Sequence, residues 1–366
     1  MNPTQHQTLA PGDAIGILGG GQLGRMLALA AARLGLKAIV LDPDPGAPAA
    51  QVAARHIQAE FDDRAALRQL AELARVVTYE FENIPADTVR ELEERAAVRP
   101  SAYALATAQD RLLEKQFLAS LGLPIAPFAE VMHAEDIAGA DTGFPAVVKT
   151  RQLGYDGKGQ ERVKDRADFA RAWGELRLEP CVLEAFIEFD AEASIIAARG
   201  LNGEFAVYDL TQNTHVDHIL ATSRVPAHFS DAVTMRAQEM ARKIGNSLEY
   251  VAVGAVELVV TGTQTLVNEI APRVHNSGHW TRDAARTSQF EQHIRAVAGW
   301  PLGSPERHSD AVMTNLIGQE VDAWPDLLHE PSAHLHLYGK RDAKPKRKMG
   351  HVTRTFPLGS LDLTAG

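Results

Sequence analysis

The chain has few of the features that mark secreted, membrane-bound or nucleic-acid-binding proteins. Its 366 residues include one cysteine, Cys181, which excludes an internal disulfide and, in an apolar stretch, is expected to be packed rather than catalytic. No apolar run approaches the length that spans a bilayer, and the first dozen residues lack the basic start and apolar core of a signal peptide. Positive charge is also in short supply, since 37 Lys and Arg face 47 Asp and Glu, a net charge of -10. We therefore expect a soluble cytoplasmic protein that binds neither nucleic acid nor a membrane.

The composition that remains, 45% hydrophobic and 23% charged, is that of an ordinary globular protein, and the length predicts two or three domains. The first hundred residues alternate strand and helix, which predicts a parallel, doubly wound sheet. Its predicted strands are Ala14–Leu18, Lys37–Leu41 and Val76–Tyr79. A first helix is predicted from the apolar residues between Leu23 and Leu34 and ends at Gly35, and two more helices are predicted at Arg64–Arg75 and Asp87–Ala97. The composition of Arg99-Pro100-Ser101 predicts a boundary near this point, and the first domain is taken as residues 1–108.

The rest of the chain divides at a second Pro- and Gly-rich linker, residues 300–305. The central block, residues 109–298, is expected to hold a strand at Ala146–Thr150, a helix at Arg166–Leu176, paired strands near 181–189 and 193–210, and a helix at Asp231–Ser247. The tail, residues 299–366, is β-rich, with short strands at 311–317, 334–338 and 350–356. The fold class is therefore mixed α/β and α+β, with a Rossmann-like first domain.

An acidic hairpin is the most informative local feature. Glu257 lies in one apolar run and Glu269 ends the next, and a hairpin centred on Thr263 would make them cross-strand partners. Like charges placed opposite each other destabilise a sheet, so the pair favours a hard cation such as Mg2+ between them. Two solvated glutamates would be the plain alternative, but the second strand runs on into Arg273 and His275, which favours a metal-dependent enzyme. Zinc held by His275 and His279 is less favoured, because no third ligand is evident.

A glycine-rich turn follows the first strand. Gly19, Gly21 and Gly24 have the spacing of a dinucleotide-binding turn, and Asp42 ends the second strand, which would indicate an NAD(P)-dependent oxidoreductase. Because no hydride-transfer site follows, we favour a turn whose backbone N–H groups hold some other anion. The segment from Glu80 to Pro85 follows the third strand, at the carboxyl edge where such sheets bind ligands. The carboxylates of Glu80 and Glu82 could meet a substrate amine or hydroxyl, or could merely begin the next helix.

A nucleotide site is indicated by a lysine and a glycine-rich loop. Lys149 ends an apolar strand, and residues 154–159 contain three glycines and a lysine, which suits a flap over phosphates. The loop is not a Walker P-loop, and a plain turn is the alternative. Further on, an apolar strand at Glu184–Ile187 with a free backbone edge could read an adenine, and Glu192 could hold ribose hydroxyls.

The tail carries a compact basic loop that includes Lys340, Arg347 and Lys348. Such a loop is usually a solvated face or a nucleic-acid patch. In a chain of net charge -10 it is more consistent with neutralising a phosphorylated small molecule.

Five segments together resemble the ATP-grasp superfamily, and within it the bacterial N5-carboxyaminoimidazole ribonucleotide synthetases. They are GGGQLGRM at 19–26, EFENIP at 80–85, GYDGKGQ at 154–160, NEIAPRVHNSGH at 268–279 and YGKRDAKPKRKMGH at 338–351. The resemblance implies a central ATP-grasp domain and a C-terminal domain that contributes to the substrate site. It implies a ligase that converts ATP, bicarbonate and 5-aminoimidazole ribonucleotide (AIR) into N5-carboxyaminoimidazole ribonucleotide, ADP and phosphate through carboxyphosphate, in purine biosynthesis. Ala271 departs from the superfamily, in which many members place a metal-binding asparagine there.

The resemblance also implies roles for individual residues and partners. The ATP site would comprise Arg111, Lys149, Gly154, Tyr155, Asp156, Gly157, Lys158, Gly159, Gln160, Glu184, Ala185, Phe186, Ile187, Glu192, His215, Asn268 and Glu269. Glu257 and Glu269 would hold Mg2+, for which Mn2+ could stand in. The substrate would meet Gln22, Glu80, Arg273, His275, Asn276, Ser277, Lys340 and Arg347, and the catalytic residues would be Tyr155, Asp156, Arg273, His275 and Lys340. A homodimer is expected. The alternatives are another ATP-grasp carboxylate–amine ligase or transformylase, the oxidoreductase above, and a regulator that binds ATP without turnover.

Overall fold

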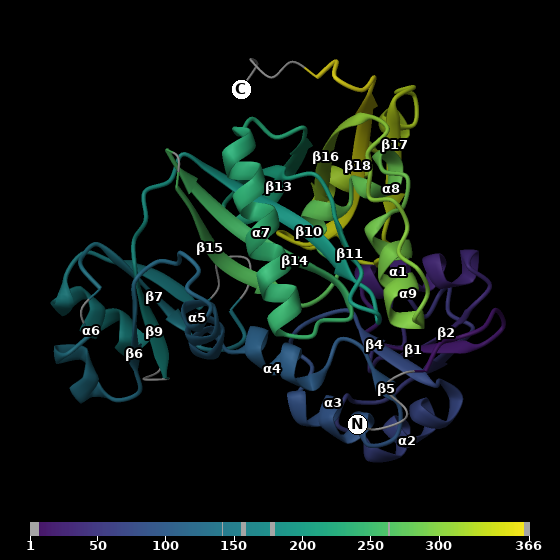
Figure 1. The fold of residues 1–366 in the computed structure, drawn as a ribbon, viewed down its shortest axis with the longest axis horizontal. Helices are drawn as coiled ribbons and strands as arrows, with labels where there is room; N and C mark the ends of the chain where they lie inside the picture. Colours follow the sequence, from purple (N-terminus) through teal and green to yellow (C-terminus); the bar gives the residue numbers. More distant parts are fainter. Residues whose placement is uncertain (1–6, 141, 155–158, 176–179, 263, 362–366) are drawn as a thin grey trace.

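The computed structural model of the chain describes residues 7–140, 142–154, 159–175, 180–262 and 264–361. Its strands form three sheets of five, nine and four strands (Figure 1). Among the described residues, no helix is both long enough and apolar enough to cross a membrane.

The N-terminal sheet is parallel and doubly wound, as predicted. Its strand order is β3-β2-β1-β4-β5, with strands β1 (Ala14–Leu18), β2 (Lys37–Leu41), β3 (Arg55–Ile57), β4 (Val76–Tyr79) and β5 (Ala97–Val98). Its helices are α1 (Gln22–Arg33), α2 (Arg64–Leu73) and α3 (Ala86–Glu93). The predicted third helix was too long. The helix ends at Glu93, and the next residues of the prediction include Ala97, which pairs with β4 as part of strand β5.

The central sheet has nine strands and extends from β15, left of centre, to β17 at the upper right of Figure 1. It is ordered β15-β14-β10-β12-β13-β16-β18-β17, with β11 beside β10. Its strands are β10 (Ala191–Arg199), β11 (Phe205–Val207), β12 (Thr211–Val216), β13 (Ile219–Val225), β14 (Ala252–Thr261), β15 (Gln264–Ala271), β16 (Asp310–Ile317), β17 (Ala333–Leu337) and β18 (Lys348–Phe356). Helix α7 (Asp231–Ser247) packs against β10, β14 and β15 through an apolar face that includes Met240 and Ile244.

The tail strands lie where the sequence predicts them, but they extend the central sheet. Strand β16 pairs with β13, so the sheet continues past residue 299 into the tail. The five helical residues Ala134–Ala138 (η2) and helix α6 (Arg166–Glu175) belong instead to a separate lobe.

That lobe is built on the four-stranded sheet, ordered β6-β9-β7-β8, at the left of Figure 1. The strands are β6 (Phe128–Val131), β7 (Ala146–Thr150), β8 (Gln160–Val163) and β9 (Cys181–Ala185). The predicted pairing of strands near 181–189 and 193–210 is wrong. β9 pairs with β6 and β7, whereas β10 pairs with β11, β12 and β14, because residues 186–190 carry the chain from one sheet to the other.

Two helices join the parts. Helix α9 (Gln289–Ala298) contacts both α1 of the N-terminal unit and strands β10 and β14 of the central sheet. Buried Arg99 donates to the carbonyls of Val297 (2.6 Å) and Gln7 (2.8 Å), and Trp300 Nε1 donates to Leu9 O (2.7 Å). Helix α5 (Arg111–Ser120), capped by Asp110, contacts β9 of the four-stranded sheet and β15 of the central sheet. The N-terminal unit, α5 and the end of β15 therefore meet.

Candidate active site

Two lysines converge on one buried carboxylate where the sheets meet. Lys115 Nζ on α5 and Lys149 Nζ on β7 lie 3.1 Å and 3.0 Å from Glu184 Oε2 on β9. Burial would raise the pKa of Glu184, but the charges of Lys149 and Lys115 outweigh it and lower that pKa. Two cations held out of water beside one anion form a site suited to a polyanion such as a nucleotide phosphate.

Lys115 was not predicted. It lies four residues after Arg111, on the same face of α5, and a search for i, i+4 cations would have found it. Its Nζ also donates to Asn268 O at 3.1 Å, which ties α5 to β15 and places Asn268, a predicted ATP-site residue, beside the lysine pair.

Arg111 and Glu114 flank the end of β15. Arg111 Nη1 lies 3.4 Å from Glu269 Oε2, and its Nη2 donates to Gly154 O at 3.2 Å, so three predicted ATP-site residues meet here. Glu114 Oε1 accepts the Ile270 N–H at 2.5 Å. Burial, and then the charge of Glu269, raise the pKa of Glu114 to about 8. Glu114 therefore carries a proton at neutral pH.

Glu257 and Glu269 are cross-strand partners in the acidic hairpin, as predicted, but the strand register that pairs them contains a bulge. The pairs nearest the turn, from Thr261↔Gln264 to Leu258↔Val267, would set Glu257 opposite Asn268. A bulge at that point advances the register by one residue and sets Glu257 opposite Glu269. Thr263, the predicted centre, lies outside the described residues.

Each of the two hairpin carboxylates already faces a cation or a donor. His275 Nε2 lies 2.9 Å from Glu257 Oε1, and Arg111 neutralises Glu269. Burial alone would raise the pKa of Glu257, but the hydrogen bond from His275, together with the positive charges around the site, lowers it below its ordinary value. The ionised form of Glu257 is therefore favoured, and a carboxylate anion has the chemistry of a Mg2+ ligand.

Glu192 and His215, both predicted at the ATP site, form a pair beside Glu257. Glu192 Oε2 on β10 lies 2.6 Å from His215 Nδ1 on β12. Burial would lower the pKa of His215, but Glu192 and then Glu257 raise it.

Arg273 links the end of the hairpin to the N-terminal unit. Its guanidinium forms a two-point ion pair with Glu82, with Nη2 donating to Oε1 at 2.9 Å. Burial would raise the pKa of Glu82, and Arg273 reverses that and lowers it. Both residues line a polar cleft whose other walls are Asn83, Ala108, Gln109, Arg111, Glu114, Arg151, Gln152, Leu153, Gly154, Glu269, Ile270 and Ala271. Of the two carboxylates of the EFENIP segment that were predicted to meet a substrate, that of Glu82 lines the cleft, next to Asn83.

The glycine-rich turn is already filled by carboxylates of the protein. Glu80 accepts the N–H groups of Gly21 and Gly24, each at 3.0 Å, and Asp42 accepts that of Gly20 at 2.6 Å. The expectation that these N–H groups are left for an external anion is therefore wrong for these three glycines. A dinucleotide pyrophosphate would need the same groups, which argues against the oxidoreductase. Gln22 is the first residue of α1, directly beyond this turn.

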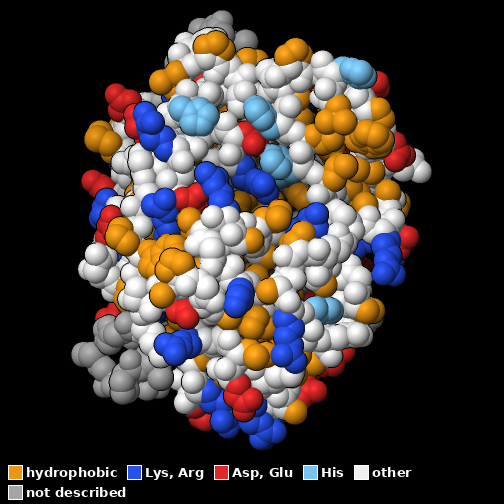
Figure 2. Space-filling view, turned by 90° about the vertical axis from the view of Figure 1, so that its right-hand side faces the viewer, with side chains coloured by type: hydrophobic (Ala, Val, Ile, Leu, Met, Phe, Trp, Pro, Cys, Tyr) orange, Lys and Arg blue, Asp and Glu red, His pale blue; other side chains and the backbone are white. Residues whose placement is uncertain are grey.

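The basic tail loop divides into a half-buried and an exposed part. Lys340 Nζ donates to Lys348 O at 2.7 Å and lies 5.5 Å from the centre of the Tyr338 ring. Burial, with the charge of Arg347, lowers the pKa of Lys340 to about 8. Arg347 donates to Asp342 O at 3.2 Å. Figure 2 shows Lys and Arg side chains beside histidines in a hollow of the face on the side of β17 and α1.

Asn276 and Ser277, both predicted to bind substrate, differ in exposure. Asn276 and Asn315 of β16 exchange two amide hydrogen bonds of 3.0 Å and 2.8 Å. Ser277 is fully buried, and its hydroxyl lies 2.8 Å from His275 Nδ1. Contact between Ser277 and a substrate stays a prediction, and the structure shows its hydroxyl engaged with His275.

The adenine expectation at residues 184–187 needs one correction. β9 is an inner strand, and the N–H groups of Ala185 and Phe186 donate to Pro127 O (2.9 Å) and Pro145 O (3.0 Å). The N–H groups of these two residues are therefore not part of a free backbone edge. Arg162 lies 3.9 Å from the Phe186 ring centre. Of the predicted flap, Gly154, Gly159 and Gln160 are described, whereas Tyr155, Asp156, Gly157 and Lys158 lie outside the described residues.

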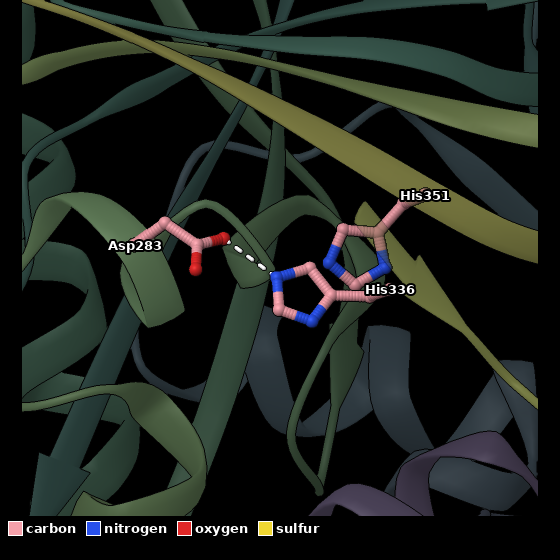
Figure 3. Close-up of side chains that lie close together, drawn as sticks. All are labelled: Asp283, His336 and His351. Atoms are coloured by element: carbon pink, nitrogen blue, oxygen red, sulfur yellow. Dashed lines mark hydrogen bonds and ion pairs between the residues drawn. The ribbon is translucent and has the colours of Figure 1, made fainter. Parts of the chain in front are cut away.

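A second group of ionisable side chains lies behind the tail loop. His336 Nε2 is 2.8 Å from Asp283 Oδ2, the His336 and His351 rings stack at 4.5 Å, and Figure 3 shows the three side chains meeting. Their ligand atoms lie within 4.8 Å of one another. Burial, and then the neighbouring His279, His336 and Arg282, lower the pKa of His351 well below its ordinary value. The same positive charge of Arg282 would oppose a metal cation here, and Asp283 is already matched by His336.

Comparison with known proteins agrees with this geometry. Family models match residues 13–109 (ribonucleotide synthetase preATP-grasp domain), 116–290 (ATP-grasp domain) and 311–357 (phosphoribosylaminoimidazole carboxylase C-terminal domain). The N5-carboxyaminoimidazole ribonucleotide synthase of Brucella melitensis is 51% identical over 355 residues, 96% of this chain and 98% of its own.

Solved structures show the same relation. A structure of the ADP complex of an N5-carboxyaminoimidazole ribonucleotide synthetase is 41% identical with a TM-score of 0.92, covering 96% of this chain and 94% of its own. The Aspergillus clavatus enzyme in complex with ADP and 5-aminoimidazole ribonucleotide is 34% identical with a TM-score of 0.88, covering 94% of each chain. With its sheets, its lysine–carboxylate cluster and its acidic hairpin, the chain therefore belongs to the N5-carboxyaminoimidazole ribonucleotide synthetases, ATP-dependent ligases of the ATP-grasp type.

Proposed function

We propose that the cleft bounded by the lysine pair, the acidic hairpin and Arg273 joins bicarbonate to the exocyclic amine of AIR at the cost of one ATP. The observation that carries this is the meeting of Lys115 and Lys149 on Glu184, next to a hairpin that carries two carboxylates in register. Phosphoryl transfer needs this combination of fixed cations and a metal-binding carboxylate pair.

The chemistry begins with bicarbonate, a poor electrophile. Its oxygen attacks the γ-phosphate of ATP, the bond to ADP breaks, and carboxyphosphate forms. The amine nitrogen of AIR then attacks the carbon of carboxyphosphate, from which phosphate leaves, or the carbon of CO2 that carboxyphosphate has already released together with phosphate. In both cases the nitrogen loses a proton as the C–N bond forms. Lys149 and Lys115 would offset the charge on the transferring phosphoryl group, and a closed flap would keep water from the labile intermediate.

The hairpin fits a magnesium ion by its donor set. Glu257 and Glu269 are opposite one another, and hard carboxylate oxygens are the ligands that Mg2+ takes. When bound, the ion would supply positive charge to the phosphates of ATP. His275 and Arg111, which pair with these carboxylates, would then be released toward the substrates.

The substrate end would be built from three parts of the chain. Arg273 and His275 would hold bicarbonate, and Asn276 lies next to them. Lys340 and Arg347 would hold the phosphate of AIR, with Gln22 and Glu80 on the N-terminal side of the same region. The charge of Glu80 acts on both Arg273 and Lys340, which supports a shared pocket.

Three further parts of the proposal concern the whole chain. The domain boundaries are 1–108, 109–298 and 299–366, and the site of action is the cytoplasm. The protein is a homodimer, which the exposed apolar side chains Trp324, Leu328 and Leu337 beside the open edge strand β17 support. Sedimentation of the wild type at several concentrations tests the last point.

The decisive experiment is ADP release with bicarbonate and AIR added singly and together. We expect turnover that requires Mg2+ and rises sharply only when both are present. Equal ADP release with and without AIR would overturn the assignment. ATP binding without any turnover would indicate the regulator instead.

A further inference from the structure

A chain of hydrogen bonds runs across the central sheet to His275. Ser223 Oγ donates to Asn213 Oδ1 at 2.8 Å, and Asn213 Nδ2 donates to Ser194 Oγ at 3.0 Å. Ser194 Oγ lies 2.6 Å from Ser277 Oγ, which lies 2.8 Å from His275 Nδ1. The three serines are fully buried and Asn213 is 7% exposed, so water does not compete for these groups.

The strand register brings this chain to the site. Ser223 on β13 is the register partner of Asn213 on β12, and Ser194 on β10 is the register partner of Glu257 on β14. Ser194 and Glu257 therefore lie side by side on one face of the sheet. His275 contacts Glu257 directly through Nε2. Its Nδ1 is linked to Ser194 indirectly, through the hydroxyl of Ser277.

The direction of these bonds determines which ring nitrogen of His275 carries the proton. An amide nitrogen only donates, so Ser194 Oγ accepts from Asn213 and gives its own single proton to Ser277. Ser277 Oγ, having accepted, donates to His275 Nδ1. The backbone N–H of Ser277 also points at His275 Nδ1, at 3.4 Å. Because this N–H can only donate, it favours an unprotonated Nδ1 whichever way the side-chain amide of Asn213 is turned.

We propose that Ser194 and Asn213 are positioning residues that hold His275 as the tautomer with its proton on Nε2, so that the ring offers an N–H donor to bicarbonate rather than a base. The inference rests on the proposed function for the identity of the anion. The nitrogen that the chain controls is Nδ1, on the side of the ring away from Glu257. The control therefore operates whether or not a cation holds Glu257.

The direct test is nitrogen NMR of the protein labelled in its histidine rings, at one fixed pH. The His275 signals are identified by their loss in His275→Gln. We expect Nδ1 without a proton and Nε2 with one in the wild type, and a mixture of tautomers in Ser194→Ala. Thr222→Ala, which alters the neighbouring residue of β13 on the opposite face, is the control and should leave the signals unchanged. A wild-type ring with its proton on Nδ1 overturns the proposal.

A kinetic test with variants of His275 itself does not depend on whether the buried Ser194→Ala variant folds. The amide nitrogen of Gln can take the place of Nε2, whereas that of Asn falls near Nδ1. If His275 is a donor, His275→Gln keeps about tenfold more activity than His275→Asn, the scale of one hydrogen bond. Ser194→Ala raises the KM for bicarbonate and leaves that for ATP unchanged. Equal loss in the Gln and Asn variants overturns the donor role.

Failure of this inference is distinguishable from failure of the proposed function. If the proposed function fails, ADP release by the wild type will not depend on bicarbonate or AIR. The NMR measurement decides the tautomer in either case.

Discussion

Glu114 shows how a single buried side chain can be tuned by its neighbours. It lies 2% exposed under the end of β15, and its pKa is about 8 instead of the ordinary 4.5. The folded state thus holds a proton that the unfolded chain releases. The stabilisation from this proton is complete below pH 4.5 and is lost as the pH rises through about 8.

We therefore predict that the wild type loses stability relative to Glu114→Gln as the pH rises from 5 to about 8, by up to about 1.4 kcal/mol per pH unit, and that the difference levels off above that. Gln keeps an oxygen for the Ile270 N–H and cannot titrate. Thermal melts of both proteins across this range measure the difference. A constant difference would show that Glu114 is ionised throughout.

Lys340 is tuned in the opposite direction, since burial and Arg347 lower its pKa to about 8. Under the proposed function, its charge meets the AIR phosphate and is lost as the pH rises through about 8. We predict that the KM for AIR rises above pH 8 while the KM for ATP does not. Lys340→Arg, whose charge persists, should show no such rise, and Lys340→Ala should have a high KM for AIR at every pH. A parallel rise in the KM for ATP would place the loop at the nucleotide instead.

At the scale of elements, the β14–β15 hairpin determines where the carboxylates lie. Its bulge is what sets Glu257 opposite Glu269, and a regular hairpin with the same turn would place Asn268 there. The carbonyl of Asn268, the extra residue at the bulge, accepts a hydrogen bond from Lys115. The bulge therefore lies beside both the metal pair and the lysine pair.

The same hairpin carries a prediction about Glu269→Gln. The lost ion pair with Arg111 is long and half exposed, and so contributes little, while the repulsion between Glu269 and its register partner Glu257 is relieved. We expect the metal-free variant to be at least as stable as the wild type and turnover to fall by about a hundredfold or more. Melts without metal and assays at saturating Mg2+ test the two halves. Near-normal turnover would show that the pair is not the metal site.

At the scale of the whole molecule, the N-terminal unit is fastened to α9 by buried polar contacts. Arg99 satisfies two backbone carbonyls, of Gln7 and Val297, that belong to different parts of the chain. We predict that Arg99→Met destabilises the protein by roughly 1–3 kcal/mol for each buried group left unpaired. Arg95→Met, which alters an exposed arginine four residues earlier, is the matched control and should change the melting temperature little. Equal effects would mean that the contact does not hold the units together.

Local patterns along the chain were enough to predict many of the helices and strands and most of the motifs. Strands β1, β2, β4 and β7 and helix α7 have their predicted bounds, because hydrophobic period and Gly or Pro boundaries are local properties. The motif resemblance likewise led to the family that the comparisons show, and it brought Arg111, Lys149, Glu184 and Glu269 into one list before any contact was known.

The partner of each charged group, in contrast, depends on how the fold brings distant residues together. Glu82 pairs with Arg273 across 191 positions, Ile270 reaches Glu114 across 156, and Glu80 closes the glycine turn that looked open. No local pattern encodes such contacts, because they depend on how three sheets pack. The same holds for the bulge at Asn268 and the serine–asparagine chain behind His275. A side chain's type is written in the sequence, but its partner and its proton are settled by burial and by neighbours distant along the chain.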